Sequence, residues 1–162
     1  MRDITSSGFV IIADTRAFAL DRAAMKAWRK RWPNFMPWEL DSDDFSLRLL
    51  VKALDSLQAV RTAYGRPMRV TCAYRNPFHN QRVGGKENSQ HLLGTAFDIV
   101  VNNRPEAESL ERLFTNAGFT AIGRYPSRFF MHIDMRPAKP SGKLYQWGRK
   151  WSYMSRNGGG GW

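Results

Sequence analysis

Two apolar segments of this chain carry ionisable side chains, and such segments restrict how the chain can fold. Asp98 stands in the apolar run of residues 96–101, and His132 and Asp134 stand in the run of residues 129–135. A carboxylate in an apolar strand costs free energy unless it is paired or bound to a metal. We therefore expect the fold to bring partners to these side chains from elsewhere in the chain.

The chain has three histidines, and two of them suggest a metal site. Catalytic zinc takes three protein ligands, often His and Asp, and keeps one position for water. His91 ends a polar loop before the strand of Asp98, and Gly94 allows a tight turn between them. We predict that His91, Asp98 and His132 bind Zn2+, whereas His79 is expected to form hydrogen bonds in a loop. The alternative is that both histidines are satisfied core residues and that Asp98 is a capped strand-end acid.

Apolar periodicity and chain-breaking residues divide the sequence into helices and strands. Helices are predicted over residues 14–31, 44–64 and 105–116. Strands are predicted over residues 68–74, 95–101, 119–123 and 129–135. This order predicts an α+β fold with a mostly antiparallel sheet flanked by helices.

The length and composition suit one domain. With 162 residues and 43% hydrophobic content, the chain can build one core. We predict a single domain over residues 1–150, with a helical part in residues 1–34, and a flexible, basic and glycine-rich tail over residues 151–162. The one cysteine, Cys72, excludes an intrachain disulfide and is expected to be a small buried strand residue. We expect the protein to be a monomer.

The chain is strongly basic, with 25 Lys and Arg against 14 Asp and Glu and a net charge of +11. Such a surface attracts polyanions, which include nucleic acid, anionic membrane and anionic cell-wall polymer. After residue 137, basic residues alternate with tyrosines and tryptophans, a pattern that can stack on single-stranded nucleic acid. The simpler alternative is a final strand that packs Trp147 and Trp151 on the core. Nucleic acid is the least favoured partner, because it leaves the histidines and Asp98 unexplained.

A longer motif surrounds the predicted metal ligands. Residues 89–98 follow the pattern Ser-x-His-x-x-Gly-x-Ala-x-Asp, and residues 132–134 follow His-x-Asp. Tyr-Arg-Asn-Pro stands at residues 74–77 and Ile-Gly-Arg-Tyr-Pro at residues 122–126. This arrangement resembles the zinc D-Ala-D-Ala carboxypeptidases and murein endopeptidases related to the Hedgehog signalling domain. The resemblance extends over about residues 35–150.

The resemblance implies a fold like that of these peptidases, a zinc cofactor, and hydrolysis of D-amino-acid-containing peptide bonds of bacterial peptidoglycan. The zinc ligands that it implies are His91, Asp98 and His132. It also implies that Arg75 binds a substrate carboxylate or carbonyl. Ser89 is implied to orient the loop or a metal ligand by a hydrogen bond, and it is counted with Arg75 among the substrate-binding residues. The Tyr125 hydroxyl is a further candidate for holding the substrate.

One position departs from the family pattern. Several branches have Asp or Glu three residues before the last zinc histidine as general base, and here that residue is Phe129. Asp134 lies on the same strand face as His132 and is the candidate base. Its alternative role is to fix His132 or an arginine by a hydrogen bond, and Glu87 is a weaker candidate for the base. The departure leaves a second hypothesis, which is a catalytically inactive zinc-binding module that binds cell wall or a partner.

The N-terminal residues 1–20 have no basic region followed by a long apolar run. No apolar stretch approaches the roughly 18 residues that span a bilayer. We therefore expect synthesis in the cytoplasm without a signal peptide. The size, charge and implied chemistry resemble a phage endolysin, which would act on the wall after release or as a component of the virion.

Overall fold

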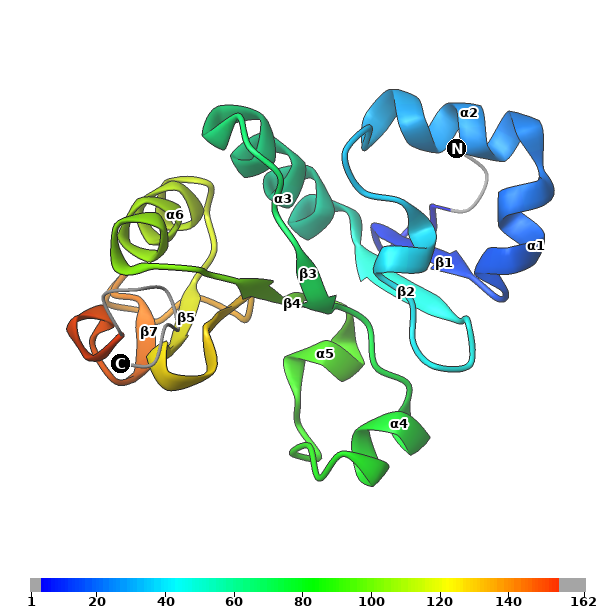
Figure 1. Cartoon of the computed structure of the whole chain (residues 1–162). Coiled ribbons are helices and arrows are strands. Elements are labelled where there is room, and N and C mark those ends of the chain that lie inside the picture. Colours follow the sequence, from blue (N-terminus) through cyan, green and yellow to red (C-terminus); the bar gives the residue numbers. More distant parts are fainter. Residues whose placement is uncertain (1–3, 155–162) are drawn as a thin grey trace.

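The computed structural model describes residues 4–154, which form two β-sheets (Figure 1). The smaller sheet pairs β1 (Phe9–Ile12) with β2 (Leu47–Leu50) in antiparallel orientation. The larger sheet, in this described part of the chain, has five strands in the order β3-β4-β6-β5-β7. Its strands are β3 (Val70–Cys72), β4 (Ala96–Val100), β5 (Ala121–Tyr125), β6 (Phe130–Asp134) and β7 (Tyr145–Gly148). The β5–β7 pair is parallel and the other pairs are antiparallel, so the predicted α+β fold is confirmed.

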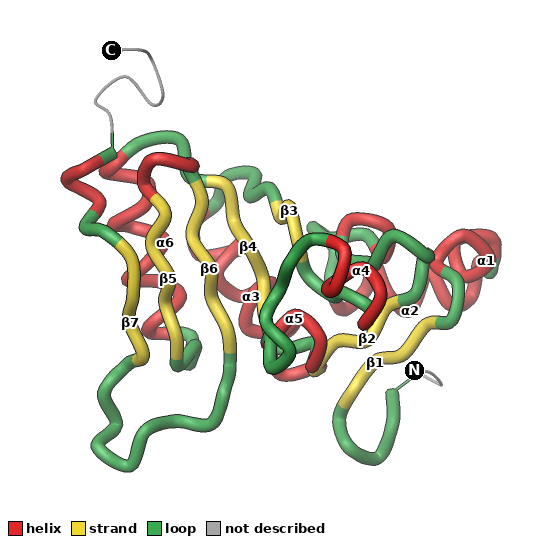
Figure 2. The backbone as a smooth tube through the Cα atoms, turned by 90° about the horizontal axis from the view of Figure 1, so that it is seen from below, coloured by secondary structure: helices red, strands yellow, loops and turns green. Residues whose placement is uncertain are grey.

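Helices flank the larger sheet on both faces (Figures 1 and 2). The α-helices are α1 (Thr15–Leu20), α2 (Arg22–Arg31), α3 (Val51–Tyr64), α4 (Pro77–Arg82), α5 (Gln90–Leu93) and α6 (Arg104–Asn116). Short 3-10 helices are η1 (Pro37–Glu39), η2 (Pro126–Arg128) and η3 (Trp151–Tyr153). Helices α3 and α6 contact each other on one face of the sheet, and α4 and α5 lie on the opposite side. The face beside α4 and α5 is the one that carries the candidate site.

Local capping explains why two predicted helix boundaries are correct. The Asn103 side chain accepts a hydrogen bond from the Glu106 amide, and Pro105 occupies the first turn, so α6 begins here. Gly65 has a left-handed backbone with φ of 70° and ends α3. Both signals are local, and for that reason they are readable in the sequence.

The helix predicted over residues 14–31 is two helices, and the single-helix prediction is wrong. Asp21 leaves the helical conformation, with φ of −83° and ψ of 103°. Its side chain accepts a hydrogen bond from the amide of Ala24, so it caps the start of α2. The chain turns at this residue, and the amphipathic pattern on each side conceals the break.

The helix predicted over residues 44–64 begins seven residues late, because residues 47–50 form β2. Leu47 and Leu49 are buried and alternate with less buried neighbours, which is the period of a strand. Phe45 has φ of 67°, a conformation that no α-helix contains. The partner strand β1 lies far away in the sequence, so local periodicity gives no sign of it.

The core and the chain ends differ in part from the predicted boundaries. Within residues 4–154, one buried apolar cluster includes residues from Val10 in β1 to Met154, so residues 1–34 contain a core strand as well as helices. Trp151 is 4% exposed and Met154 is 5% exposed, so the predicted flexible tail cannot begin at residue 151. The remainder of that predicted tail, residues 155–162, lies outside the described residues. Among the described helices, none is both long and apolar enough to cross a membrane.

Candidate metal centre

One row of residues crosses the larger sheet and carries the candidate site. The backbone register places Cys72 opposite Asp98, Asp98 opposite His132, His132 opposite Gly123, and Gly123 opposite Trp147. Residues that lie opposite each other on neighbouring strands present their side chains to the same face. Strands β3, β4, β6, β5 and β7 therefore each place one residue of this row on the face beside α4 and α5.

His91 reaches this row from helix α5. The Ser89 hydroxyl caps the helix by accepting a hydrogen bond from the His91 amide at 3.3 Å. Gly94 ends the helix with φ of 73°, and a Cβ at this position would overlap the carbonyl oxygen of Arg48. This short, tightly closed turn leaves the His91 side chain only 4% exposed and directs it toward Asp98. Ser89 thus has the orienting contact that the resemblance implies.

The three predicted metal ligands lie together. Nε2 of His91 is 3.3 Å from Oδ1 of Asp98, and Nδ1 of His132 is 3.0 Å from the same oxygen. The two imidazole rings lie 5.1 Å apart and nearly perpendicular, at 77°. Ligand atoms on a tetrahedral zinc, each at roughly 2.0–2.1 Å, lie about 3.3 Å from one another. The two separations at Asp98 are thus of the size that a shared zinc ion requires.

The outer nitrogens of both imidazoles have hydrogen-bond acceptors. Nδ1 of His91 lies 2.7 Å from the carbonyl oxygen of Ala73, which can only accept, so Nδ1 carries the proton. Nε2 of His132 lies 2.8 Å from Oδ2 of Asp134. These contacts hold a proton on the outer nitrogen of each ring, so Nε2 of His91 and Nδ1 of His132, which face Asp98, are the atoms that could bind a metal. Metal-binding histidines have this arrangement, in which the second nitrogen donates to a carbonyl or carboxylate.

The electrostatics of the centre favour a bound cation. Burial alone raises the pKa of Asp98, but hydrogen bonds from His132 and His91 outweigh it and lower the pKa below its usual range. Burial lowers the pKa of His91, yet the hydrogen bond and charge of Asp98 raise it overall. A carboxylate that stays ionised inside a nearly buried cluster needs a positive partner. A divalent cation supplies that charge and competes with protons for the same atoms.

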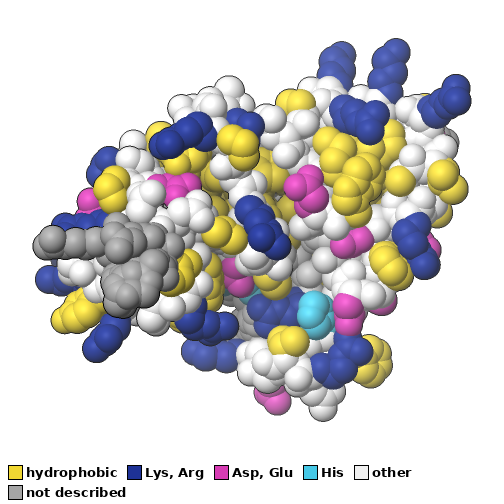
Figure 3. All heavy atoms as spheres, in the orientation of Figure 1, with side chains coloured by type: hydrophobic (Ala, Val, Ile, Leu, Met, Phe, Trp, Pro, Cys, Tyr) yellow, Lys and Arg dark blue, Asp and Glu magenta, His cyan; other side chains and the backbone are white. Residues whose placement is uncertain are grey.

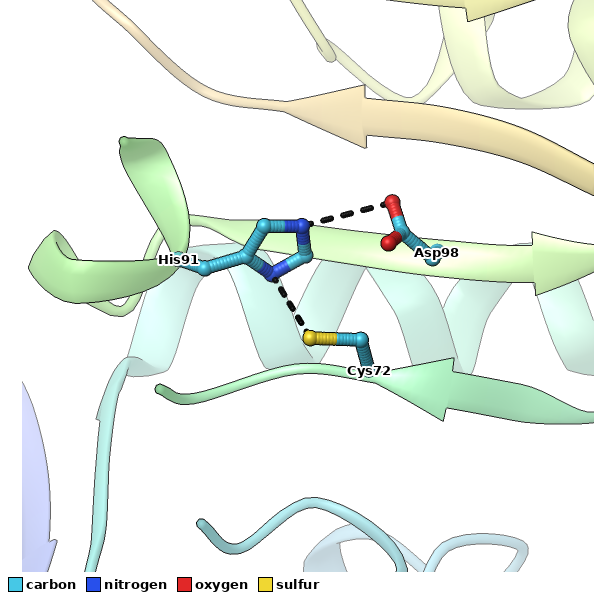
Figure 4. Close-up of side chains that lie close together, drawn as sticks. All are labelled: Cys72, His91 and Asp98. Carbon is cyan, nitrogen blue, oxygen red and sulfur yellow. Dashed lines mark hydrogen bonds and ion pairs between the residues drawn. The ribbon is translucent and has the colours of Figure 1, made fainter. Parts of the chain in front are cut away.

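Cys72 lies beside the centre and offers a different triad. Its Sγ is 3.5 Å from Nδ1 of His91, and ligand atoms of Cys72, His91 and Asp98 lie within 4.8 Å of one another. Figure 4 shows His91 between the other two, with one ring nitrogen toward each. Nδ1 of His91 is already bonded to the Ala73 carbonyl, so an ion shared with Asp98 belongs on the Nε2 side, away from Cys72. His132, the third predicted ligand, lies 3.0 Å from the same oxygen of Asp98.

Asp134 is fully buried and holds His132 through its second nitrogen. Its Oδ1 accepts hydrogen bonds from the amide and Nε of Arg136, at 3.0 and 2.8 Å. Its Oδ2 accepts from Nη2 of Arg136 at 2.6 Å and faces His132. Burial raises the pKa of Asp134, but the hydrogen bonds from Arg136 and His132 outweigh it and lower the pKa. Both oxygens are occupied, which matches the alternative role of fixing His132 and an arginine, while the role of base stays a prediction.

Arg75 lies between β3 and α4, beside the short helix that carries His91. Its amide donates to the carbonyl oxygen of His91 at 3.2 Å, and its Nη1 donates to Oδ1 of Asn80 at 3.0 Å. Within residues 4–154, no carboxylate forms an ion pair with this guanidinium. Arg75 therefore keeps donors for a substrate. His79 forms the predicted hydrogen bond, to the Ser42 hydroxyl at 3.1 Å, but it lies on helix α4 and not in a loop.

The side of the centre opposite Arg75 is aromatic. The Tyr125 ring stacks on Phe130, with ring centres 4.3 Å apart, and its hydroxyl accepts a hydrogen bond from Nε1 of Trp147 at 2.8 Å. Trp147 also lies 5.3 Å from the His132 ring. The sequence did not place Trp147 at the site, because only the register of β7 brings it there. Trp151 packs in the core as predicted, whereas Trp147 does not belong to the buried cluster.

The fold thus gathers His and Asp side chains on one face of the larger sheet, as a metal centre requires. Comparison with protein families identifies the class to which the chain belongs. The chain is a member of the Peptidase M15 family, whose model matches residues 18–134 and whose members are zinc-dependent metallopeptidases. The match includes all three predicted ligands and ends before β7. No curated protein matches this chain.

Proposed function

We propose that this protein is a zinc peptidase that hydrolyses D-amino-acid-containing peptide bonds of bacterial peptidoglycan, as a carboxypeptidase or endopeptidase. The observation that supports the proposal is the orientation of His91 and His132, which each direct one ring nitrogen at the same oxygen of Asp98 while the other nitrogen is bonded elsewhere. Membership of the Peptidase M15 family supports the substrate class. Phage lysis or wall remodelling is the biological setting we propose.

The ligands and their partners have distinct tasks in this mechanism. His91, Asp98 and His132 would hold Zn2+, which when bound polarises a scissile carbonyl and lowers the pKa of bound water to about 7. Ala73 and Asp134 keep the two imidazoles in the required tautomer and orientation. The nearly complete burial of His91 limits competing water around that ligand.

Arg75 and Tyr125 would bind the substrate from opposite sides of the centre. The guanidinium of Arg75 offers paired donors that match a carboxylate or a carbonyl oxygen. The Tyr125 hydroxyl accepts from Trp147 and keeps its own proton for donation to a substrate oxygen. A peptide held between these groups would have its scissile bond next to the three ligands.

Digestion of purified peptidoglycan, followed by mass spectrometry of the released peptides, tests this function. We expect new peptide ends with the wild type and none with His132→Ala, and the product masses identify the bond. Leu20→Ala is a suitable control, because Leu20 is 85% exposed and lies at the end of α1. Equal product release by wild type and His132→Ala would refute a role for the centre in hydrolysis.

A second candidate function is a zinc-binding module without activity. It is favoured by Phe129, which stands where several branches of the family have an acid, and by the occupied oxygens of Asp134. If the wild type binds zinc but cleaves nothing, this candidate predicts that Phe129→Asp introduces cleavage. Cleavage by the wild type excludes it.

A further inference from the structure

Trp147 on the edge strand β7 lies over the backbone of Gly123. The register pairs Gly123 with Trp147 on one side and with His132 on the other. A Cβ on Gly123 would come within 2.5–2.7 Å of three indole atoms of Trp147. The absence of a side chain at Gly123 thus lets the indole lie across β5 and contact the His132 ring, with centroids 5.3 Å apart and planes at 47°.

Two further contacts hold the indole in this position. Its Nε1 donates to the Tyr125 hydroxyl at 2.8 Å, and Tyr125 is in turn stacked on Phe130. The guanidinium carbon of Arg136 lies 5.1 Å from the centre of the indole ring. The same guanidinium binds Asp134, the acceptor of the His132 Nε2 hydrogen. Trp147 therefore touches both the imidazole of His132 and the arginine that fixes its carboxylate partner.

We propose that Trp147 is a positioning residue of the metal centre, and that Gly123 provides the space for its indole. Rotation of the His132 ring would require the indole to move, and the indole is held by Tyr125 and Arg136. Trp147 thereby keeps Nδ1 of His132 directed at Asp98. Trp147 lies in β7, beyond the residues 18–134 that the family model matches.

The proposal rests on metal binding by the centre but not on hydrolysis, so metal affinity is the readout. We would measure Zn2+ affinity by competition with a chelating dye, and the d–d absorption spectrum after Co2+ substitution, which reports ligand geometry. Partners that orient a metal ligand typically change affinity by 10–100-fold. We expect Trp147→Ala and Gly123→Ala each to weaken Zn2+ binding roughly 10-fold and to alter the Co2+ spectrum. Trp147→Phe, which keeps an aromatic ring, should restore most of both.

Two controls keep this test decisive. Tyr153→Ala removes an aromatic side chain that is 61% exposed in η3, and it should leave affinity and spectrum unchanged. Gly123→Ala keeps the tryptophan but displaces its indole, whereas Trp147→Ala removes the indole. Both variants therefore lose the contact between the indole and the His132 ring. Wild-type affinity and spectrum in both variants would overturn the proposal while leaving the peptidase intact. Failure of the wild type itself to bind metal would overturn the proposed function as well.

Discussion

At the residue scale, the centre depends on which atom of each imidazole is free. His91 and His132 use different nitrogens toward Asp98, Nε2 in one and Nδ1 in the other, and an acceptor fixes each choice. The motif spacing predicted these three residues as ligands, but it could not reveal the Ala73 carbonyl. A backbone acceptor has no sequence signature, and it becomes visible only when β3 passes beside α5.

The Asp134→Asn substitution tests whether this acid acts as general base or holds His132 by a hydrogen bond. Because both oxygens are occupied and the residue is fully buried, we expect it to act by holding His132. The Asp134→Asn substitution should then weaken Zn2+ binding roughly 10–100-fold in a competition titration. Unchanged Zn2+ affinity combined with a loss of kcat of several orders of magnitude would instead identify Asp134 as the general base.

Gly94→Ala tests whether the turn that carries His91 requires glycine. The left-handed backbone alone costs an alanine about 1–2 kcal/mol, and overlap with the Arg48 carbonyl adds to it, for a total of roughly 3 kcal/mol. Gly65→Ala is the matched control, because Gly65 also ends a helix with positive φ but has no atom within 4 Å of its added Cβ. Urea denaturation of both variants measures the difference, and equal losses would show that the Arg48 contact is unimportant.

At the element scale, helices and strands with local sequence signals were predicted, whereas those that depend on long-range pairing were not. Four strands of the larger sheet, β3 to β6, and helix α6 were predictable because their apolar runs and caps lie within them. The strand β2 was not, since its pairing with β1 joins segments about 40 residues apart, and the leucines of 47–50 also fit a helix. For the same reason the sequence placed Trp147 on the core instead of beside His132.

Glu111 joins three elements, and its pH dependence is predictable. On α6 it bonds Nε of Arg124 on β5 at 2.8 Å and Nε1 of Trp151 at 2.7 Å. Burial raises the pKa of Glu111, but the bonds from Arg124 and Trp151 outweigh it and lower the pKa below the usual value of 4.5. A carboxyl whose folded pKa is lowered stabilises the fold above its unfolded pKa and loses that contribution as the pH falls.

Glu111→Gln should therefore lower the free energy of unfolding by about 1–3 kcal/mol near neutral pH. The difference from the wild type should begin to shrink as the pH falls below about 4, where the unfolded carboxyl takes up a proton, and should disappear once the pH falls below the lowered folded pKa. Urea denaturation of both proteins near neutral pH and below about pH 4 measures this difference in the free energy of unfolding. An equal difference at the two pH values would mean that the charge of Glu111 contributes nothing to stability.

At the scale of the whole molecule, the chain carries a net charge of +11. On the face that Figure 3 displays, the Lys and Arg side chains are spread over the surface. A spread charge favours loose attraction to an anionic wall or membrane surface over a defined site. We expect retention on anionic wall polymer to fall steeply between about 50 mM and 500 mM salt in a sedimentation assay, because screening shortens the reach of these charges. Retention that is insensitive to salt would contradict this account.

Metal content tests the central claim most directly. We would measure zinc by elemental analysis in the purified wild type and in His91→Ala and His132→Ala, each checked for folding by circular dichroism. The account predicts about one zinc per wild-type chain and a large loss in both variants, because each removes one of three ligands. A folded wild type that takes up no zinc, or variants that retain it fully, would contradict the assignment of His91, Asp98 and His132 as the metal centre.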